Sequence, residues 1–100
     1  MNWDDEVYYS GVDEEDIRRE KAKARALRQS RWWQNKLAEG LCHYCARAVP
    51  KSELTMDHVV PLTRGGKSVK GNLAVCCKEC NTRKKNLLPL EWDEYLEKLS

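Results

Sequence analysis

Four of the five cysteines in this chain form two Cys-x-x-Cys pairs, a spacing typical of metal sites. Zinc prefers four tetrahedral ligands, and a two-residue gap lets one turn of chain supply two thiolates to the same ion. The alternative is a redox-active pair, but a second pair favours a closed metal site over it. The sequence therefore predicts a structural Zn²⁺ ion held by Cys42, Cys45, Cys77 and Cys80.

A second set of polar residues lies around these pairs and has the types needed to hydrolyse a phosphodiester bond. A neutral histidine can deprotonate water near neutral pH. Carboxylate and amide oxygens can hold a hard cation and leave positions open for phosphate and water. Each residue also has a plainer interpretation, as a core histidine, a turn-capping carboxylate, an Asx turn or a helix-surface amide. The residues of this set are Asp57, His58, Asn72 and Asn81.

Two short strands are expected to carry most of this set. Apolar and β-branched residues predict strands at 53–60 and 73–76, joined by a loop. Successive side chains of a strand point to opposite faces of the sheet. We therefore expect a twist or bulge near Pro61 to let Asp57 and His58 face the same site.

Helices are predicted on both sides of this hairpin. Residues 41–49 form a knuckle turn, a helix runs from 77 to about 87 until Pro89 ends it, and a last amphipathic helix occupies 90–99 within the final segment 89–100.

The first part of the chain is expected to form one long helix. Residues 1–12 are an acidic, aromatic tail, and 13–40 contain no helix breaker between an Asp13 N-cap and a stop at Gly40. The three-to-four-residue spacing of apolar residues predicts a packed face. That face comprises Ala22, Ala26, Ser30, Trp33 and Leu37.

Charge is strongly segregated along the chain, although the net charge is only +2. Residues 17–40 carry eight bases and two acids, and residues 41–88 carry nine bases and three acids, so the middle is +12. A basic centre is typical of nucleic-acid binding, although a solvated face would have the same composition. A basic stripe on the first helix, with Trp32 beside it, suits a phosphate backbone. The residues predicted to contact DNA are Lys21, Arg25, Arg28, Arg64, Lys67, Arg83, Lys84 and Lys85.

Length and composition limit what the chain can be. One hundred residues make one domain at most, and a domain this small often needs a metal to stabilise it. With 34% charged residues and no run near the roughly 18 apolar residues of a membrane helix, we expect no membrane partner. The acidic start of the chain lacks the apolar segment of a signal peptide, so we expect a cytoplasmic protein.

Taken together, the motifs resemble those of an HNH endonuclease from the zinc-knuckle-bearing branch of that family. The resemblance covers roughly residues 41–88 and does not extend to the first forty or the last ten. It implies an α+β fold: a small ββα-metal domain with a structural zinc knuckle, preceded by a long N-terminal helix and followed by a short C-terminal helix. The motifs that carry it are Asp57-His58, Gly65-Gly66, Asn72-Leu73 and Cys77-x-x-Cys80-Asn81-x-x-Lys84.

The resemblance also implies a metal-dependent DNA endonuclease with a role for each polar residue. His58 resembles the general base, and Asn72 resembles the residue whose hydrogen bonds hold the loop that orients it. Asp57 and Asn81 resemble the ligands of the catalytic metal. An amide oxygen is harder than the imidazole nitrogen of other members, which favours Mg²⁺ or Mn²⁺.

Two other functions are consistent with the sequence. One is a non-catalytic zinc-ribbon module that holds DNA or RNA, and the other is an adaptor in which zinc braces a protein-interaction surface. The presence of His58, Asn72 and Asn81 favours the nuclease over both. Because one such site cuts one strand, paired cuts would need two sites, most simply in a homodimer.

Overall fold

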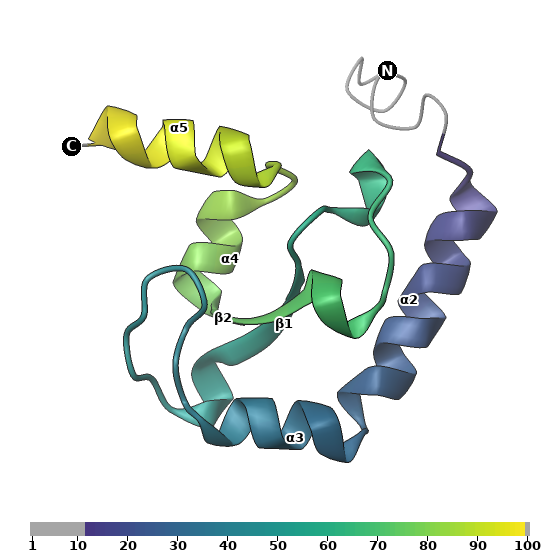
Figure 1. Cartoon of the computed structure of the whole chain (residues 1–100), viewed down its shortest axis with the longest axis horizontal. Helices are drawn as coiled ribbons and strands as arrows, with labels where there is room; N and C mark the ends of the chain where they lie inside the picture. The colour runs from purple at the N-terminus through teal and green to yellow at the C-terminus, as the bar shows by residue number, and fades with distance from the viewer. Residues whose placement is uncertain (1–11, 100) are drawn as a thin grey trace.

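The computed structural model describes residues 12–99, so all but the last residue of the predicted 1–12 tail lies outside the described residues. Two strands lie at the centre, with α2 and α3 on one side of the molecule and α4 and α5 on the other (Figure 1). The elements are α2 (Glu14–Arg28), α3 (Arg31–Ala38), β1 (Leu54–His58), β2 (Leu73–Cys77), α4 (Lys78–Lys84) and α5 (Pro89–Leu99). The predicted α+β fold class is confirmed.

The strands β1 and β2 pair antiparallel in an unbroken register, in which Asp57 lies opposite Ala74 and His58 opposite Leu73. The ladder runs to His58 without a bulge, and the chain bends at Val59 and Val60, just before Pro61, so the expected change of direction lies after the strand. Side chains therefore alternate regularly, and Asp57 and His58 leave β1 on opposite faces of the sheet.

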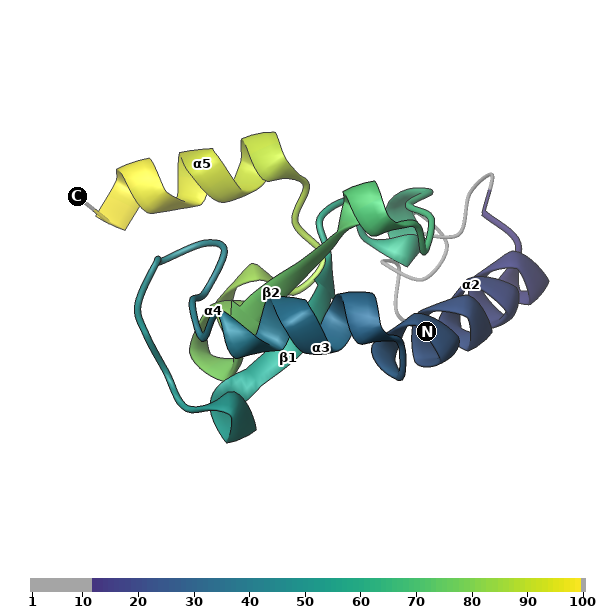
Figure 2. The same ribbon diagram turned by 60° about the horizontal axis from the view of Figure 1, so that its bottom comes forward.

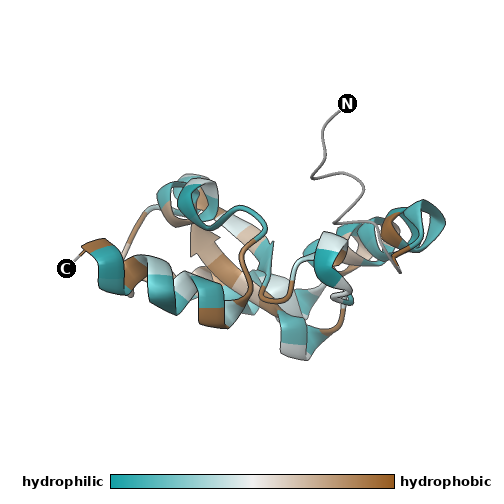
Figure 3. Cartoon of the chain, turned by 90° about the horizontal axis from the view of Figure 1, so that it is seen from above, coloured by the Kyte–Doolittle hydropathy of each residue, from teal (hydrophilic) through white to brown (hydrophobic). Residues whose placement is uncertain are grey.

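One face of the sheet packs against α3, which crosses the strands in Figure 2. Trp33 of α3 is 2% exposed and packs with Leu54 and Val75. Hydrophobic residues concentrate on the strands, whereas α2 is mostly hydrophilic (Figure 3). The opposite face carries Asp57 and receives α4. The two sides of this hairpin therefore meet different helices, α3 on one and α4 on the other.

The predicted single helix 13–40 is wrong, because the chain breaks into α2 and α3 at Ser30. The Ser30 side chain accepts a hydrogen bond from Trp33 N at 3.2 Å and donates one to Leu27 O at 2.6 Å. Serine competes for backbone groups in this way, which makes it a good N-cap even where glycine and proline are absent. The break lets α2 turn away from α3 and run beside the loop between the strands (Figure 1).

The packed face predicted for the first helix is correct for α3 and wrong for α2. Trp33 is buried as expected, but Ala22 and Ala26 are exposed. The residues that α2 buries are Ile17, Glu20 and Ala24. One of these is a carboxylate, and burial of a charge requires polar partners.

Several helix ends follow the predicted rules. Asp13 caps α2 by accepting from Glu15 N at 2.9 Å, and Gly40 ends α3 with φ of +68°. Pro89 begins α5 instead of only ending the preceding helix, since a first-turn proline loses no helical hydrogen bond. Within residues 12–99, none of the helices has the length and apolar character needed to cross a bilayer.

Candidate active site and metal centre

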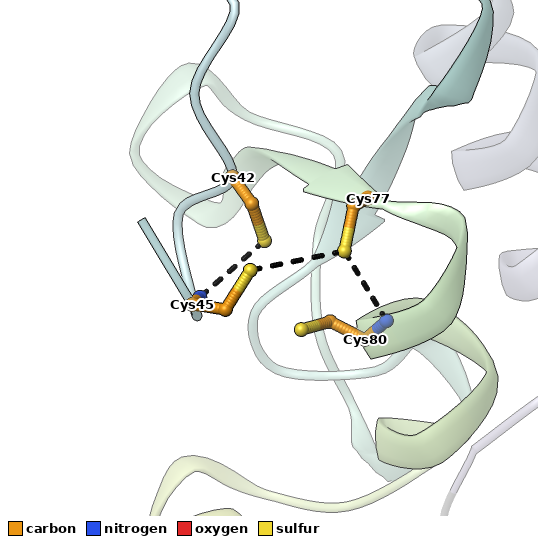
Figure 4. Close-up of side chains that lie close together, drawn as sticks. All are labelled: Cys42, Cys45, Cys77 and Cys80. Atoms are coloured by element: carbon orange, nitrogen blue, oxygen red, sulfur yellow. Dashed lines mark hydrogen bonds between the residues drawn. The ribbon is translucent and has the colours of Figure 1, made fainter. Parts of the chain in front are cut away.

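The side chains of the four paired cysteines converge from two segments of the chain (Figure 4). All four Sγ atoms lie within 4.8 Å of one another, and Cys45 Sγ is 3.9 Å from Cys77 Sγ. A tetrahedral zinc ion with Zn–S bonds of about 2.3 Å would place its sulfur ligands about 3.8 Å apart. The cluster of Cys42, Cys45, Cys77 and Cys80 therefore fits a structural zinc ion.

Hydrogen bonds to these sulfur atoms favour the thiolate form that binds metals. The Cys80 backbone N–H donates to Cys77 Sγ at 3.4 Å, and Arg47 donates to Cys45 Sγ at 3.4 Å and to Cys77 Sγ at 3.6 Å. Burial opposes ionisation of Cys45, but hydrogen bonds from Arg47, Cys42 and Cys80 together outweigh it and lower the thiol pKa to about 6. Burial raises the pKa of the Cys80 thiol, so the cluster supplies four sulfur donors, and Cys80 must lose its proton as a metal binds.

A second site lies at the end of β1, where a cavity of about 310 Å³ is lined by three of the predicted residues. Asp57 and His58 reach it from β1, and Asn81 reaches it from α4. Although the two β1 residues point to opposite faces, the cavity opens where the strand ends, so both contribute to its wall. Helix α2 contributes Lys21 and Ile17 to the same cavity.

His58 is half-buried, and its ring is held by the loop between the strands. Its Nε2 atom lies 2.8 Å from the Oγ atom of Ser68. Burial lowers the pKa of the His58 imidazole below its ordinary value, and the opposing effect of the Asp57 charge is smaller. The ring is therefore neutral at neutral pH, which is the form that can accept a proton.

Asp57 is buried and its Oδ2 atom has two partners. The Tyr44 hydroxyl donates to it at 2.5 Å, and Lys84 Nζ lies 3.2 Å away. Lys84 is fully buried, and its ammonium also donates to the backbone oxygen of His58 at 3.2 Å. Lys84 was predicted to contact DNA, but its charge is enclosed with Asp57 and joins α4 to the end of β1.

The buried pair gives a first prediction. Lys84→Met should lower the free energy of unfolding by about 3–5 kcal/mol, because it leaves the Asp57 carboxylate buried without its cation. Urea denaturation in excess Zn²⁺ measures this. The matched control is Lys78→Met, an exposed position on the same helix, which should stay within about 0.5 kcal/mol of wild type. Equal effects of the two substitutions would show that the pair does not stabilise the fold.

Asn72 fastens the loop between the strands through its side chain. Its Oδ1 accepts from Val60 N at 2.8 Å, and its Nδ2 donates to Val60 O at 3.0 Å and Lys67 O at 2.9 Å. The loop is so tight that a Cβ atom at Gly66 would lie 1.7 Å from the Val60 oxygen. Only glycine fits there, and the loop that carries Ser68 to His58 is closely defined.

The basic residues predicted to meet DNA divide into three environments. Arg64 forms a two-pronged pair with Glu91, with nitrogen–oxygen distances of 3.0 and 3.1 Å, which joins the loop to α5. Lys84 is enclosed, as described above. The remaining residues are exposed, and they are Lys21, Arg25, Arg28, Lys67, Arg83 and Lys85.

Comparison with known proteins agrees with this geometry. A family model described as HNH endonuclease matches residues 42–96, which is more than half of the chain. The match runs into α5, beyond the limit of 88 expected from the motifs. A search of curated proteins finds no significant match. The zinc-fitting cysteine cluster, the hairpin with its following helix and the family match together establish that this chain belongs to the HNH endonuclease family.

Proposed function

We propose that this protein is a metal-dependent endonuclease that hydrolyses phosphodiester bonds in DNA, with His58 as its general base. The observation that carries the proposal is the cavity in which Asp57, His58 and Asn81 meet. A half-buried neutral imidazole beside two oxygen donors is the arrangement that water activation requires.

The cavity suits a hard divalent cation. Asp57 and Asn81 offer carboxylate and amide oxygens from two elements that the Lys84 contact holds together. Both described partners of Asp57 fall on Oδ2, so Oδ1 is not used by either. Bound there, Mg²⁺ or Mn²⁺ would stabilise negative charge on the phosphoryl and leaving oxygens.

Side chains of the protein would accept the proton, hold the loop and bind the phosphate. His58 accepts a proton from the attacking water, and Asn72 keeps the neighbouring loop in place. Lys21 from α2 and Lys85 from the end of α4 line the cavity, where their ammonium groups can neutralise a phosphate. Two lysines lining a cavity that also holds a base and two oxygen ligands favour a polyanionic substrate.

The exposed face of α2 extends this positive surface. Lys21, Arg25 and Arg28 are spaced by four and three residues, which places them on one side of the helix. Arg28 lies close enough to His58 for its charge to add to the dominant effect of burial in lowering the imidazole pKa. A duplex lying along this stripe would pass over the cavity.

A plasmid assay tests the nuclease proposal. Zinc-loaded protein should convert supercoiled plasmid to the open-circular form when Mg²⁺ or Mn²⁺ is added, and should leave it intact in buffer without them. One site cuts one strand, so nicked circles should precede linear product. Absence of cleavage by folded, zinc-loaded protein with either metal would contradict the proposal and favour a zinc-ribbon binding module.

The α2 stripe gives a second prediction. Replacing Arg25 and Arg28 by alanine together should weaken DNA binding, and should reduce the slope of log K against log salt by about 0.9 for each phosphate that the two arginines neutralise. Fluorescence anisotropy without Mg²⁺ measures the affinity. Lys51→Ala with Lys98→Ala removes the same net charge elsewhere and should leave the slope unchanged. Identical slopes for the two double variants would show that Arg25 and Arg28 face solvent and do not contact DNA.

A further inference from the structure

The hydrogen bond between His58 and Ser68 is one part of a longer chain of buried contacts. Ser68 is 4% exposed, and its Oγ donates to the backbone oxygen of Glu20 at 2.6 Å. A serine hydroxyl has one proton to give, and a carbonyl oxygen can only accept. At the 2.8 Å contact, Ser68 Oγ must therefore accept, and the proton of the neutral His58 ring lies on Nε2.

Glu20 holds Ser68 a second time through its side chain. Its Oε1 accepts from the Ser68 backbone N–H at 2.6 Å, and its Oε2 pairs with Lys23 at 3.0 Å. Glu20 is only 5% exposed. The Ser68 hydrogen bond, followed by the Lys23 interaction, lowers the pKa of Glu20, so the group is ionised at neutral pH. A single helical residue thus fixes both the backbone and the hydroxyl of Ser68.

We propose that Glu20 and Ser68 are positioning residues that hold His58 in the Nε2–H tautomer and so leave Nδ1 as the basic nitrogen. The inference rests on the proposed function, in which His58 is the general base. As the water O–H bond breaks, its proton moves to Nδ1 and its oxygen bonds to phosphorus. The P–O bond to the leaving sugar oxygen breaks, and that oxygen takes a proton from solvent water. The imidazolium that forms keeps its Nε2–H bond to Ser68. The hydrogen bond to Ser68 keeps a proton on Nε2, and a hydrogen bond at one ring nitrogen is what fixes a histidine's tautomer and orientation.

The inference gives α2 a place in the active site. Glu20 lies outside residues 42–96, the part of the chain that matches the family model. Glu20 lies on the buried face of α2, between Ile17 and Ala24, and its hydrogen bonds with Ser68 satisfy polar groups that would otherwise be buried without a partner. Helix α2 presents basic residues at the surface, and through Glu20 and Ser68 it also positions His58.

Nitrogen NMR tests the tautomer without any cleavage. Long-range ¹H–¹⁵N spectra of zinc-loaded full-length protein at neutral pH distinguish Nε2–H from Nδ1–H rings, and the exposed His43 serves as an internal reference. We expect His58 as the Nε2–H form in wild type. Ser68→Ala should add Nδ1–H signal, and Ser68→Thr should restore the wild-type spectrum. A wild-type His58 in the Nδ1–H form would overturn the inference, whether or not any variant folds.

Cleavage rates at saturating DNA supply the second readout. Ser68→Ala should lower the rate by up to about tenfold, the equivalent of one hydrogen bond of ordinary strength, without weakening DNA binding. Ser68→Thr should recover the rate, and Ser52→Ala, at an exposed serine, should match wild type. A folded Ser68→Ala protein with unchanged tautomer and rate would overturn the inference. If wild type does not cut DNA, the proposed function fails, while the NMR result still decides the tautomer.

Discussion

His58→Ala should lower the rate of DNA cleavage by about 10²–10⁴-fold, the usual contribution of a general base. The imidazole is proposed to act only on the proton of water, so DNA affinity and zinc content should stay close to wild type. Because the ring is half-buried beside Ser68, its removal leaves space but no unpaired charge. The rate is measured on supercoiled plasmid at saturating Mg²⁺ or Mn²⁺.

The second histidine of the chain provides the matched control. His43 is exposed on the knuckle turn, and His43→Ala should cut at the wild-type rate. Asn81→Ala should instead raise the Mg²⁺ concentration needed for half-maximal rate, because it removes a proposed ligand. Asp57→Ala removes the other proposed ligand and also leaves Lys84 buried without its carboxylate, so it should lower stability as well. A His58→Ala protein that cleaves as fast as wild type would remove the nuclease assignment from this cavity.

Cys45→Ser should abolish zinc binding and unfold the protein. Structural zinc sites in small peptides contribute about 10–16 kcal/mol of apparent binding free energy at neutral pH. A typical domain has a net stability of only about 5–15 kcal/mol. Losing the zinc would therefore remove most or all of the stability of a 100-residue chain whose sheet has two strands. Zinc content and far-ultraviolet circular dichroism are the two measurements.

The fifth cysteine is the control for this experiment. Cys76 is fully buried next to Cys77, and its Sγ donates to the Cys77 backbone oxygen at 3.3 Å. Cys76→Ala should retain one zinc ion per chain, even if it melts at a lower temperature. A Cys45→Ser protein that is free of metal yet unfolds cooperatively would contradict the structural role of the zinc.

The sequence predicts those parts of the site that depend on spacing. Two Cys-x-x-Cys pairs specify a ligand set almost independently of the fold, since one turn supplies each pair. The hairpin follows from its β-branched and apolar residues, whereas the helix predicted to reach about 87 ends at Lys84, and Pro89 begins α5. The cavity could not be predicted from the sequence, because residues from β1 and α4 meet only after the hairpin and helix pack together.

The contacts missed by the sequence are those between segments far apart in the chain. Glu20 and Ser68 are separated by 48 positions, and neither belongs to a motif. A glutamate at a buried position of α2 indicates a buried polar partner. The sequence could have shown this only if the buried face of that helix had been predicted correctly. Lys84 was misjudged for a related reason. A lysine in a basic stretch looks solvated, whereas the carboxylate that draws it inside comes from β1.

Cys80 and Asn81 are neighbours on α4, one facing the sulfur cluster and the other the candidate active site. Consecutive residues of a helix differ by about 100° around its axis, so the direction of one fixes that of the other. A rotation of α4 that withdrew Cys80 from the cluster would also carry Asn81 out of the cavity. If the protein cuts DNA as proposed, the fraction of competent molecules would then follow the supply of free zinc in their surroundings, although zinc has no part in the proposed cleavage step.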